Sequence, residues 1–329
     1  MAIGLTLLAG LALLVVGGEL LVRGSVRVAE RLGVSPLLIG LTLVGFGTST
    51  PEIVTSVQAA LIGSPGIAVG NIVGSNMANM LLILGASALI CPLAVQSRAL
   101  SRDGVVGLAS AALLAAVGWT FGLSRAVGAG FLLMLAAYLY YAFRQERVAA
   151  EDHTAAFDRA EAFASADVAL RPRAPATTGL RGWLVPLAIA VGGLISIVAG
   201  GRLLVSGAVD LARLLGMSEA VIGLTIVAAG TSAPELVTSL VAAVRRQTDV
   251  AVGNILGSNI YNLLGIGGLT GIIAPTPVPA QIAAFDSPLM VGASLLLLLF
   301  AWTGARLNRA EGGLLLAAYA SYVAWLVAG

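Results

Sequence analysis

An internal repeat constrains the fold of this chain more than any other feature. Residues 17–79 align without a gap with residues 200–262, at a constant offset of 183 (200 − 17 = 183), and more than half of the aligned positions are identical. In the strongest stretch, GLTLVGFGTSTPEIVTS at 40–56 pairs with GLTIVAAGTSAPELVTS at 223–239. Identity this high within one chain indicates a duplicated structural unit.

Composition identifies lipid as the solvent around this repeated unit. Of the 329 residues, 58% are hydrophobic and 10% are charged, whereas soluble domains carry about 25% charged residues. A soluble fold of this size would have to cover its surface with polar side chains, and this chain has too few of them. The basic residues form no patch of the kind that a nucleic acid requires, and the single cysteine, Cys91, allows no disulfide framework.

Ten apolar segments are long enough to span a bilayer, which takes about 20 residues of helix. They run over residues 3–22, 36–62, 68–91, 104–122, 126–143, 183–206, 219–244, 251–274, 282–303 and 311–328. Each copy of the repeat contains five segments, and because five is odd, the second copy enters the membrane from the opposite side. We therefore expect an all-α integral membrane protein with ten transmembrane helices in two inverted five-helix repeats, an arrangement of many secondary transporters.

One long hydrophilic stretch divides the chain. We expect residues 1–143 to form the first five-helix repeat, 144–181 a cytoplasmic linker, and 182–329 the second repeat. All 18 basic residues are arginines, of which 15 fall on the linker side of the predicted spans and 3 on the other side. The positive-inside rule then makes the linker side cytoplasmic and puts both termini outside. The short linker favours the cytoplasmic (inner) membrane of a prokaryote.

Two carboxylates lie in the middle of apolar segments, Glu52 in GTSTPE and Glu235 in GTSAPE. A carboxylate inside a membrane is costly and by default indicates function, and no arginine lies in the middle of a segment to pair with it. Pro51 and Pro234 each remove a backbone donor and predict a helix that is broken at the midplane. Such breaks are tolerated where the freed carbonyls line a cavity or meet an ion.

Side-chain oxygens accompany these glutamates in both repeats. The hydroxyls and amides with a predicted role in cation binding are Thr48, Ser49, Thr231, Ser232, Ser75, Ser258, Asn79 and Asn262. The other recurring amides, for which we expect packing or capping roles, are Asn71, Asn76, Asn254 and Asn259. Two carboxylates in an all-oxygen set suit hard cations such as Ca²⁺, whereas transition metals prefer softer ligands.

At these residues the chain resembles the sodium/calcium exchangers of the cation/calcium exchanger superfamily, because GTSTPE and GTSAPE match the signature of that family's repeats. The resemblance covers essentially the whole chain. It implies an antiporter, not an enzyme, that carries no cofactor and transports Ca²⁺ and Na⁺. It further implies that Glu52 and Glu235 are the central ligands, shared by both ions. Backbone carbonyls near Gly45 and Ala228, three residues before each motif threonine, are implied as further ligands.

The coupling ion stays open at this point. Proton-coupled relatives carry a Gly-Asn-x-x-Glu version of the motif, so the Thr-Ser version favours Na⁺, with a Ca²⁺/H⁺ antiporter as the alternative and a cation channel as a weaker one. Asn262 stands where the potassium-dependent branch has aspartate, which argues against K⁺ co-transport. The expected partners are therefore Ca²⁺, Na⁺ and the lipid bilayer, with no obligate protein partner evident.

Two predictions concern residues outside the motifs. The first and sixth segments are long, rich in glycine and free of the ligand motif, so we expect them to form the moving gate. Asp286 lies just inside the ninth segment, beside Ser287 and Pro288, and we interpret it as an interfacial residue without a repeat partner.

Overall fold

The computed structural model is almost entirely helical over the residues that it describes, which are 2–31, 46, 49–94, 98–146, 180–244, 246, 248–304 and 306–328. The first half consists of α1 (Ala2–Arg31), α4 (Thr50–Leu61), α5 (Pro65–Met77), the π-helix η2 (Ala78–Ile83), α6 (Leu84–Ile90), the strand β1 (Leu93–Ala94), α7 (Arg98–Thr120) and α8 (Arg125–Glu146). The second half consists of α10 (Leu180–Leu215), α11 (Glu219–Ile222), η4 (Gly223–Val227), α12 (Ala228–Thr231), α13 (Ala233–Val244), α14 (Thr248–Ile260), η5 (Tyr261–Ile266), α15 (Gly267–Ile273), η6 (Ile282–Asp286), α16 (Ser287–Gly304), β2 (Arg306–Leu307) and α17 (Arg309–Ala328).

The lengths of these helices fit a membrane protein. Within the described residues, seven helical stretches are long and apolar enough to cross a bilayer, and the bent pair 219–231 and 233–244 makes an eighth if it counts as one span. Helices lie over every predicted segment, although residues 36–45, 47 and 48 of the second segment fall outside the described part. An all-α membrane protein is therefore confirmed, while the count of ten crossings stays a prediction.

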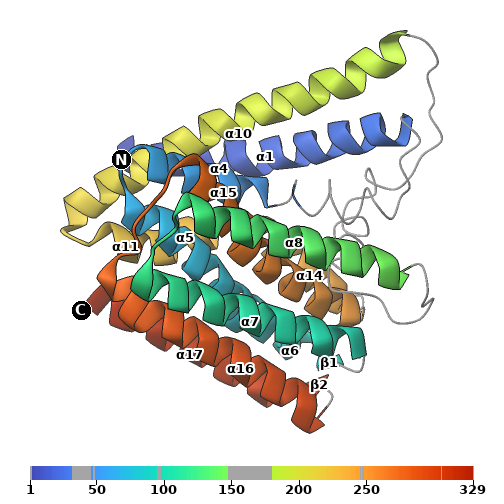
Figure 1. Ribbon diagram of the computed structural model, residues 1–329, viewed down its shortest axis with the longest axis vertical. Helices are drawn as coiled ribbons and strands as arrows, with labels where there is room; N and C mark the ends of the chain where they lie inside the picture. The colour runs from blue at the N-terminus through green and yellow to red at the C-terminus, as the bar shows by residue number, and fades with distance from the viewer. Residues whose placement is uncertain are drawn as a thin grey trace.

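The two ends of the helix bundle differ in what they carry. Figure 1 shows that α1 begins and α17 ends at the same end of the molecule, whereas α8 ends and α10 begins at the opposite end. Each half of the chain therefore starts at one end and finishes at the other. The arginine-rich starts of α7 and α17 also lie at the end where α8 finishes, in the place that the charge pattern predicts for the linker side.

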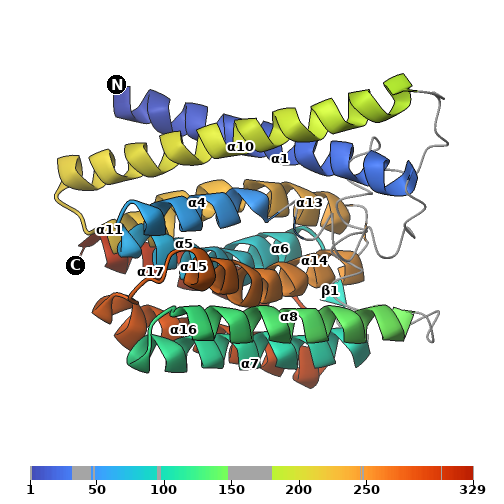
Figure 2. The ribbon, with the colours of Figure 1, turned by 45° about the horizontal axis from the view of Figure 1, so that its top comes forward.

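Two long helices, α1 and α10, lie side by side and antiparallel along one edge of the molecule (Figures 1 and 2). Glycines let their backbones touch, because a Cβ added at Gly17 would lie 2.8 Å from the backbone nitrogen of Ile197, and one added at Gly193 would lie 2.4 Å from that of Leu21. The glycines recur every seven residues on each helix, at 10, 17 and 24 and again at 193, 200 and 207. Small residues at this spacing allow close helix contact in lipid, where apolar burial alone drives no association.

The centre of the bundle is formed by the second conserved stretch of each repeat. In the span Pro65–Ile90, 94% of the most apolar window is buried inside the protein. Both central spans switch to a π-helix at the same place, η2 and η5, whose bounds differ by the repeat offset of 183 (261 − 78 = 183). π-Turns are rare and frequently occur at functional sites, and these two carry Asn79 and Asn262.

Short backbone pairings extend the repeat into the loops. β1 and β2 pair antiparallel, with Leu93 opposite Leu307, and an isolated bridge joins Leu123 to Thr276. The offset of 183 maps 93 onto 276 and 123 onto 306, which is one residue from Leu307, so the two pairings correspond in the two halves with a register shift of one residue. Strands of two residues carry no sequence pattern, which is why the all-α expectation omits them.

Candidate cation-binding site

The helix break predicted at the second motif is present. Helix α12 ends at Thr231 and α13 begins at Ala233, with a bend of 51° between the two halves. Ser232, at the break, has φ −80° and ψ 9°, and its repeat partner Ser49 has nearly the same angles, φ −84° and ψ 3°. Each break places a glutamate in the first turn of the helix that follows. The positive end of the helix dipole stabilises a negative charge there.

The two glutamates are buried, with 1% of Glu52 and 2% of Glu235 exposed. The hydroxyl of Ser232 donates a hydrogen bond to Oε1 of Glu52 at 3.4 Å, across 180 residues of sequence. A hydroxyl of the second motif therefore contacts the carboxylate of the first. The structure brings the two motifs together at the interface of the two halves.

Two asparagines fasten the glutamate turns to the central helices. The Asn71 amide donates to the backbone carbonyl of Glu52 at 3.3 Å and to Oγ of Ser56 at 2.9 Å. Asn254, its repeat partner, donates in the same way to the carbonyl of Glu235 at 3.4 Å and to Oγ of Ser239 at 2.7 Å. Asn71 and Asn254 thus have the packing role expected for them, and the segments that they hold are the two helix turns that carry the glutamates.

Asn71 also reaches the opposite motif, because Oγ1 of Thr231 donates to its Oδ1 at 3.1 Å. The packing interpretation of the sequence missed this link to the site. Recurrence of Asn71 and Asn254 at the repeat offset was the available signal, but spacing alone does not separate a packing amide from one that joins two site residues.

The carbonyl of Ala228 forms a second contact between the two halves. It accepts hydrogen bonds from Oγ of Ser75 at 3.5 Å and from Oγ1 of Thr231 at 3.3 Å. Ser75 comes from α5, and Ala228 and Thr231 come from α12. Three of the sequence-predicted site residues therefore share one buried polar contact.

Several buried oxygens face this region without satisfying their hydrogen-bonding capacity. Among the described residues, Oδ1 of Asn79, Oδ1 of Asn262 and Oγ of Ser258 are buried and have no hydrogen-bond partner. Leaving a buried polar atom unpaired is costly, so such atoms in a native fold are explained by a bound water or ion or by a functional role. Amide and hydroxyl oxygens are suitable ligands for hard cations.

The structure leaves part of the predicted set untested. Thr48 and Gly45 lie outside the described residues. Ser49 is described and is 1% exposed, directly before the buried turn of Glu52. In the described part of the chain no three His, Cys, Asp or Glu side chains form a metal-binding group, so the carboxylate ligands there number at most two at any point.

The interpretation of Asp286 as a residue without a repeat partner is wrong, while its depth in the membrane stays a prediction. Its side chain is fully buried, and its Oδ1 accepts a hydrogen bond of 2.9 Å from the hydroxyl of Tyr322 on α17. The repeat offset gives it a partner, Asp103 (286 − 183 = 103), which is also fully buried. The partner was missed because the sequence comparison covered only residues 17–79 and 200–262, and the repeat extends beyond them.

Comparison with known proteins agrees with this geometry. The sequence profile described as "Sodium/calcium exchanger protein" matches residues 3–144 and 185–328. The putative antiporter CaxA of Alkalimonas amylolytica is 40% identical over 96% of this chain and 95% of its own length. The sodium/calcium exchanger MaX1 of Methanosarcina acetivorans is 34% identical, over 97% of both chains.

Solved structures support the same assignment. A structure of the sodium-calcium exchanger NCX_Mj soaked with Na⁺ and Sr²⁺ superposes with a TM-score of 0.61, at 33% sequence identity and with 98% of each chain covered. The profile covers both halves of this chain, and the relatives extend over nearly its full length. The chain belongs to the sodium/calcium exchanger family and is a membrane antiporter, not an enzyme.

Proposed function

We propose that the protein exchanges Na⁺ for Ca²⁺ by alternating access, electrogenically and without K⁺. The observation that carries this proposal is the contact between Ser232 and Glu52, which joins the two carboxylate motifs of the repeat into one buried oxygen cluster. Two carboxylates balance one Ca²⁺ or much of the charge of several Na⁺ ions. An empty cluster leaves these charges unpaired in a medium of low dielectric, so the ion-free protein changes orientation slowly, and transport becomes obligatory exchange.

The proposed ligands are the residues of this cluster. They are Glu52, Glu235, Thr48, Ser49, Thr231, Ser232, Ser75, Ser258, Asn79 and Asn262, with backbone oxygens near Gly45 and Ala228. Support comes from the burial of the described members and from the unpaired oxygens of Asn79, Asn262 and Ser258. The names of MaX1 and NCX_Mj, both sodium/calcium exchangers, favour Na⁺ as the coupling ion.

The proposed topology has ten crossings in two inverted repeats, 1–143 and 182–329, joined by a cytoplasmic linker at 144–181. The position of both chain ends opposite the end of α8 supports an odd number of crossings in each half. With the arginine-rich end inside, both termini face outward. A prokaryotic inner membrane is in keeping with a relative of 33% identity, the inner membrane protein YrbG of Escherichia coli.

The proposed gate is the pair α1 and α10. Its packing on the two repeats is unequal, because Gln58 on α4 donates to the carbonyl of Val198 on α10 at 3.1 Å, and a Cβ at Gly201 would lie 2.7 Å from Val54. The repeat partner of Val54 is Val237 on α13, which is 58% exposed. The gate therefore packs on Val54 of α4 and leaves the equivalent position of α13 exposed, an asymmetry that supports one of two alternating states.

Reconstituted vesicles test the exchange. Vesicles loaded with Na⁺ and diluted into Na⁺-free medium with Ca²⁺ should accumulate Ca²⁺, and addition of K⁺ should not change the rate. Glu52→Gln and Glu235→Gln should each abolish uptake, because each removes half of the charge that balances Ca²⁺. Asp210→Asn is the matched control, since the Asp210 side chain is 58% exposed on α10, and it should leave uptake intact.

Proton coupling is the competing function, because the name of CaxA specifies an antiporter but no coupling ion. The same vesicles, loaded without Na⁺ and given only a pH gradient, decide between the two. Uptake under the pH gradient alone, with none under the Na⁺ gradient, refutes Na⁺ coupling. Full activity in both glutamine variants refutes the site.

A further inference from the structure

For every hydrogen bond around the cluster, shifting the residue numbers by 183 gives the equivalent bond that is expected in the other repeat. The bonds of Asn71 to the Glu52 turn and of Asn254 to the Glu235 turn obey this offset. Two sets of bonds do not. Asn254 also donates to Oγ1 of Thr238 at 3.1 Å, whereas the equivalent hydroxyl, that of Thr55, has no partner among the described residues.

The second set joins the two repeats. The Asn79 amide donates to Oδ1 of Asn259 at 3.0 Å, a bond between the two repeats. Adding and subtracting 183 maps this bond onto one from Asn262 to Asn76 (79 + 183 = 262; 259 − 183 = 76).

The equivalent bond from Asn262 to Asn76 is not formed among the described residues. The Asn76 amide turns back along its own helix instead and donates to the carbonyl of Ile72 at 2.7 Å. Among the described residues, Oδ1 of Asn76 has no hydrogen-bond partner. This oxygen is the acceptor that the missing bond would use, and Asn76 is fully buried.

The two halves of an inverted repeat exchange their conformations when a transporter changes the side to which its site opens. A bond present in one half only is therefore expected to move to the other half. We propose that Asn259 and Asn76 are alternating positioning residues. Asn259 holds Asn79 in the state shown here, and Asn76 holds Asn262 in the opposite-facing state.

Each residue acts through a proposed cation ligand. In the state described, the bond to Asn259 fixes the amide nitrogen of Asn79, so the free Oδ1 of Asn79 is the atom left to face a cation. Asn262 has no such restraint and keeps its own Oδ1 unpaired. In each state, a hydrogen bond thus holds one of the two ligand amides in a fixed orientation. The free energy of cation binding therefore depends on the state.

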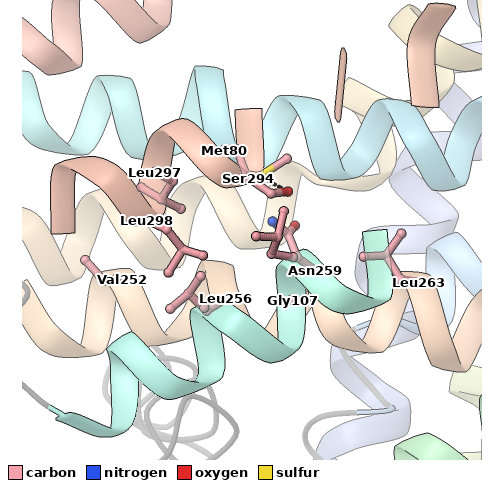
Figure 3. Close-up of a pocket in the computed structure, with 11 residues that line it drawn as sticks. Met80, Gly107, Val252, Leu256, Asn259, Leu263, Ser294, Leu297 and Leu298 are labelled. Carbon is pink, nitrogen blue, oxygen red and sulfur yellow. Dashed lines mark hydrogen bonds between the residues drawn. The ribbon is translucent and has the colours of Figure 1, made fainter. Parts of the chain in front are cut away.

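The surroundings of Asn259 give it room to leave this bond. It lines a cavity of about 30 Å³, together with Met80, Gly107 and Ser294, and Figure 3 shows its amide on the side of Met80 and Ser294. A cavity that holds a water needs about 10–15 Å³, so this cavity has room for a group of that size beside the amide of Asn259. By symmetry, its alternative acceptor is the carbonyl of Ile255 (72 + 183 = 255).

The inference rests on the alternating access proposed above but not on the identity of the coupling ion, so its test measures orientation and not transport. Single cysteines are placed at Val54 or Val237 in a Cys91→Ser chain and labelled with N-ethylmaleimide in vesicles. Val237 lies on the uncovered side and Val54 beneath the gate. The ratio of the labelling rates, V237C over V54C, then reports the balance of the two states.

Asn259→Ala should lower this ratio roughly three- to tenfold, the effect of one lost buried hydrogen bond on a two-state equilibrium. Asn76→Ala should raise it, because the opposite-facing state then lacks its bond. The double variant should return the ratio toward that of the parent, because each state then lacks one bond. If an alanine variant does not fold, Asn259→Ser and Asn76→Ser replace it, since serine is too short to make either bond.

A purely structural role for both asparagines would lower the unfolding temperature of both variants without moving the ratio in opposite directions. The proposal is overturned if Asn259→Ala leaves the ratio unchanged, if Asn76→Ala fails to raise it, or if the double variant shows no return. Absence of Na⁺-driven uptake would not affect this readout, so the two proposals fail separately.

Discussion

At the scale of single residues, the cluster depends on neutral amides as much as on its carboxylates. Asn71 bonds three groups at once, the carbonyl of Glu52, Oγ of Ser56 and the hydroxyl of Thr231. Two of these belong to the proposed cation site and come from opposite repeats. Asn71 therefore sets the distance between the first glutamate turn and the second broken helix.

Asn71→Ala tests this role. Each buried partner left unpaired costs about 1–3 kcal/mol, so the variant should unfold at a lower temperature and need a higher Ca²⁺ concentration for half-maximal uptake. Thermal unfolding in detergent and vesicle uptake measure the two effects. Ser206→Ala is the control, because the exposed Ser206 hydroxyl bonds only to Leu203 of its own helix. Equal behaviour of the two variants would contradict the assignment.

The sequence predicts where the two motif glutamates lie but not what they bond to. Intramembrane position and repetition predict the burial of Glu52 and Glu235, because a charged side chain in lipid must face the protein interior. Spacing within one helix cannot predict bonds between helices that are far apart in sequence. The bond from Ser232 to Glu52 and the unequal pairing of Asn76 and Asn259 depend on tertiary packing and on the conformational state.

At the scale of elements, the backbones of α1 and α10 lie closer together than they could if larger side chains separated them. Their glycines meet backbone atoms of the other helix at three levels on each side. A pair with touching backbones has little freedom to separate. We therefore expect α1 and α10 to move as one unit over α4 and α13.

Two neighbouring glycines of α10 test the close contact. Gly193→Ala places a Cβ 2.4 Å from the backbone of Leu21, whereas nothing lies within 4 Å of a Cβ at Gly192. Alanine is the better helix former by about 1 kcal/mol, so Gly192→Ala should keep or raise the unfolding temperature. Gly193→Ala should lower it by several degrees and slow exchange. A similar unfolding temperature for both variants would show that the contact is not tight.

Element positions were predictable because twenty-residue apolar runs and motif prolines are strong signals. The bend at Ser232 follows from Pro234, which cannot donate to the preceding turn. The π-helices η2 and η5 were not predicted, because one extra residue in a turn hardly changes an already apolar pattern. The same uniform apolarity hides the burial of Asp286, whose bond to Tyr322 depends on the packing of α17.

At the scale of the whole molecule, the arrangement of the chain ends gives a prediction about topology. α1 begins and α17 ends opposite the end that carries the arginine-rich helix starts. The parity of the spans predicts that both termini share one side, and the charge bias counted on these spans predicts that this side is the outside. The proposed cytoplasmic linker then joins two halves that cross the membrane in opposite directions.

Reporter fusions measure this orientation. Alkaline phosphatase folds only outside the cytoplasm, so fusions after residue 328 and before residue 2 should be active in bacterial cells. A fusion within 144–181 should be inactive, and a fluorescent protein inserted there should fluoresce. Opposite activities at the two termini would require an even number of crossings in one half or a missing span.

The contact between α1 and α10 has a consequence for the origin of the molecule. The contact of Gly17 with Ile197 returns, shifted by the offset, as that of Gly200 with Leu14, and the contact of Gly10 with Leu204 returns as that of Gly193 with Leu21. Equal surfaces meet on both sides, as in the isologous interface of a twofold dimer. A half-length chain inserted in both orientations would make the same interface, and the linker ties the two halves of such a dimer into one chain.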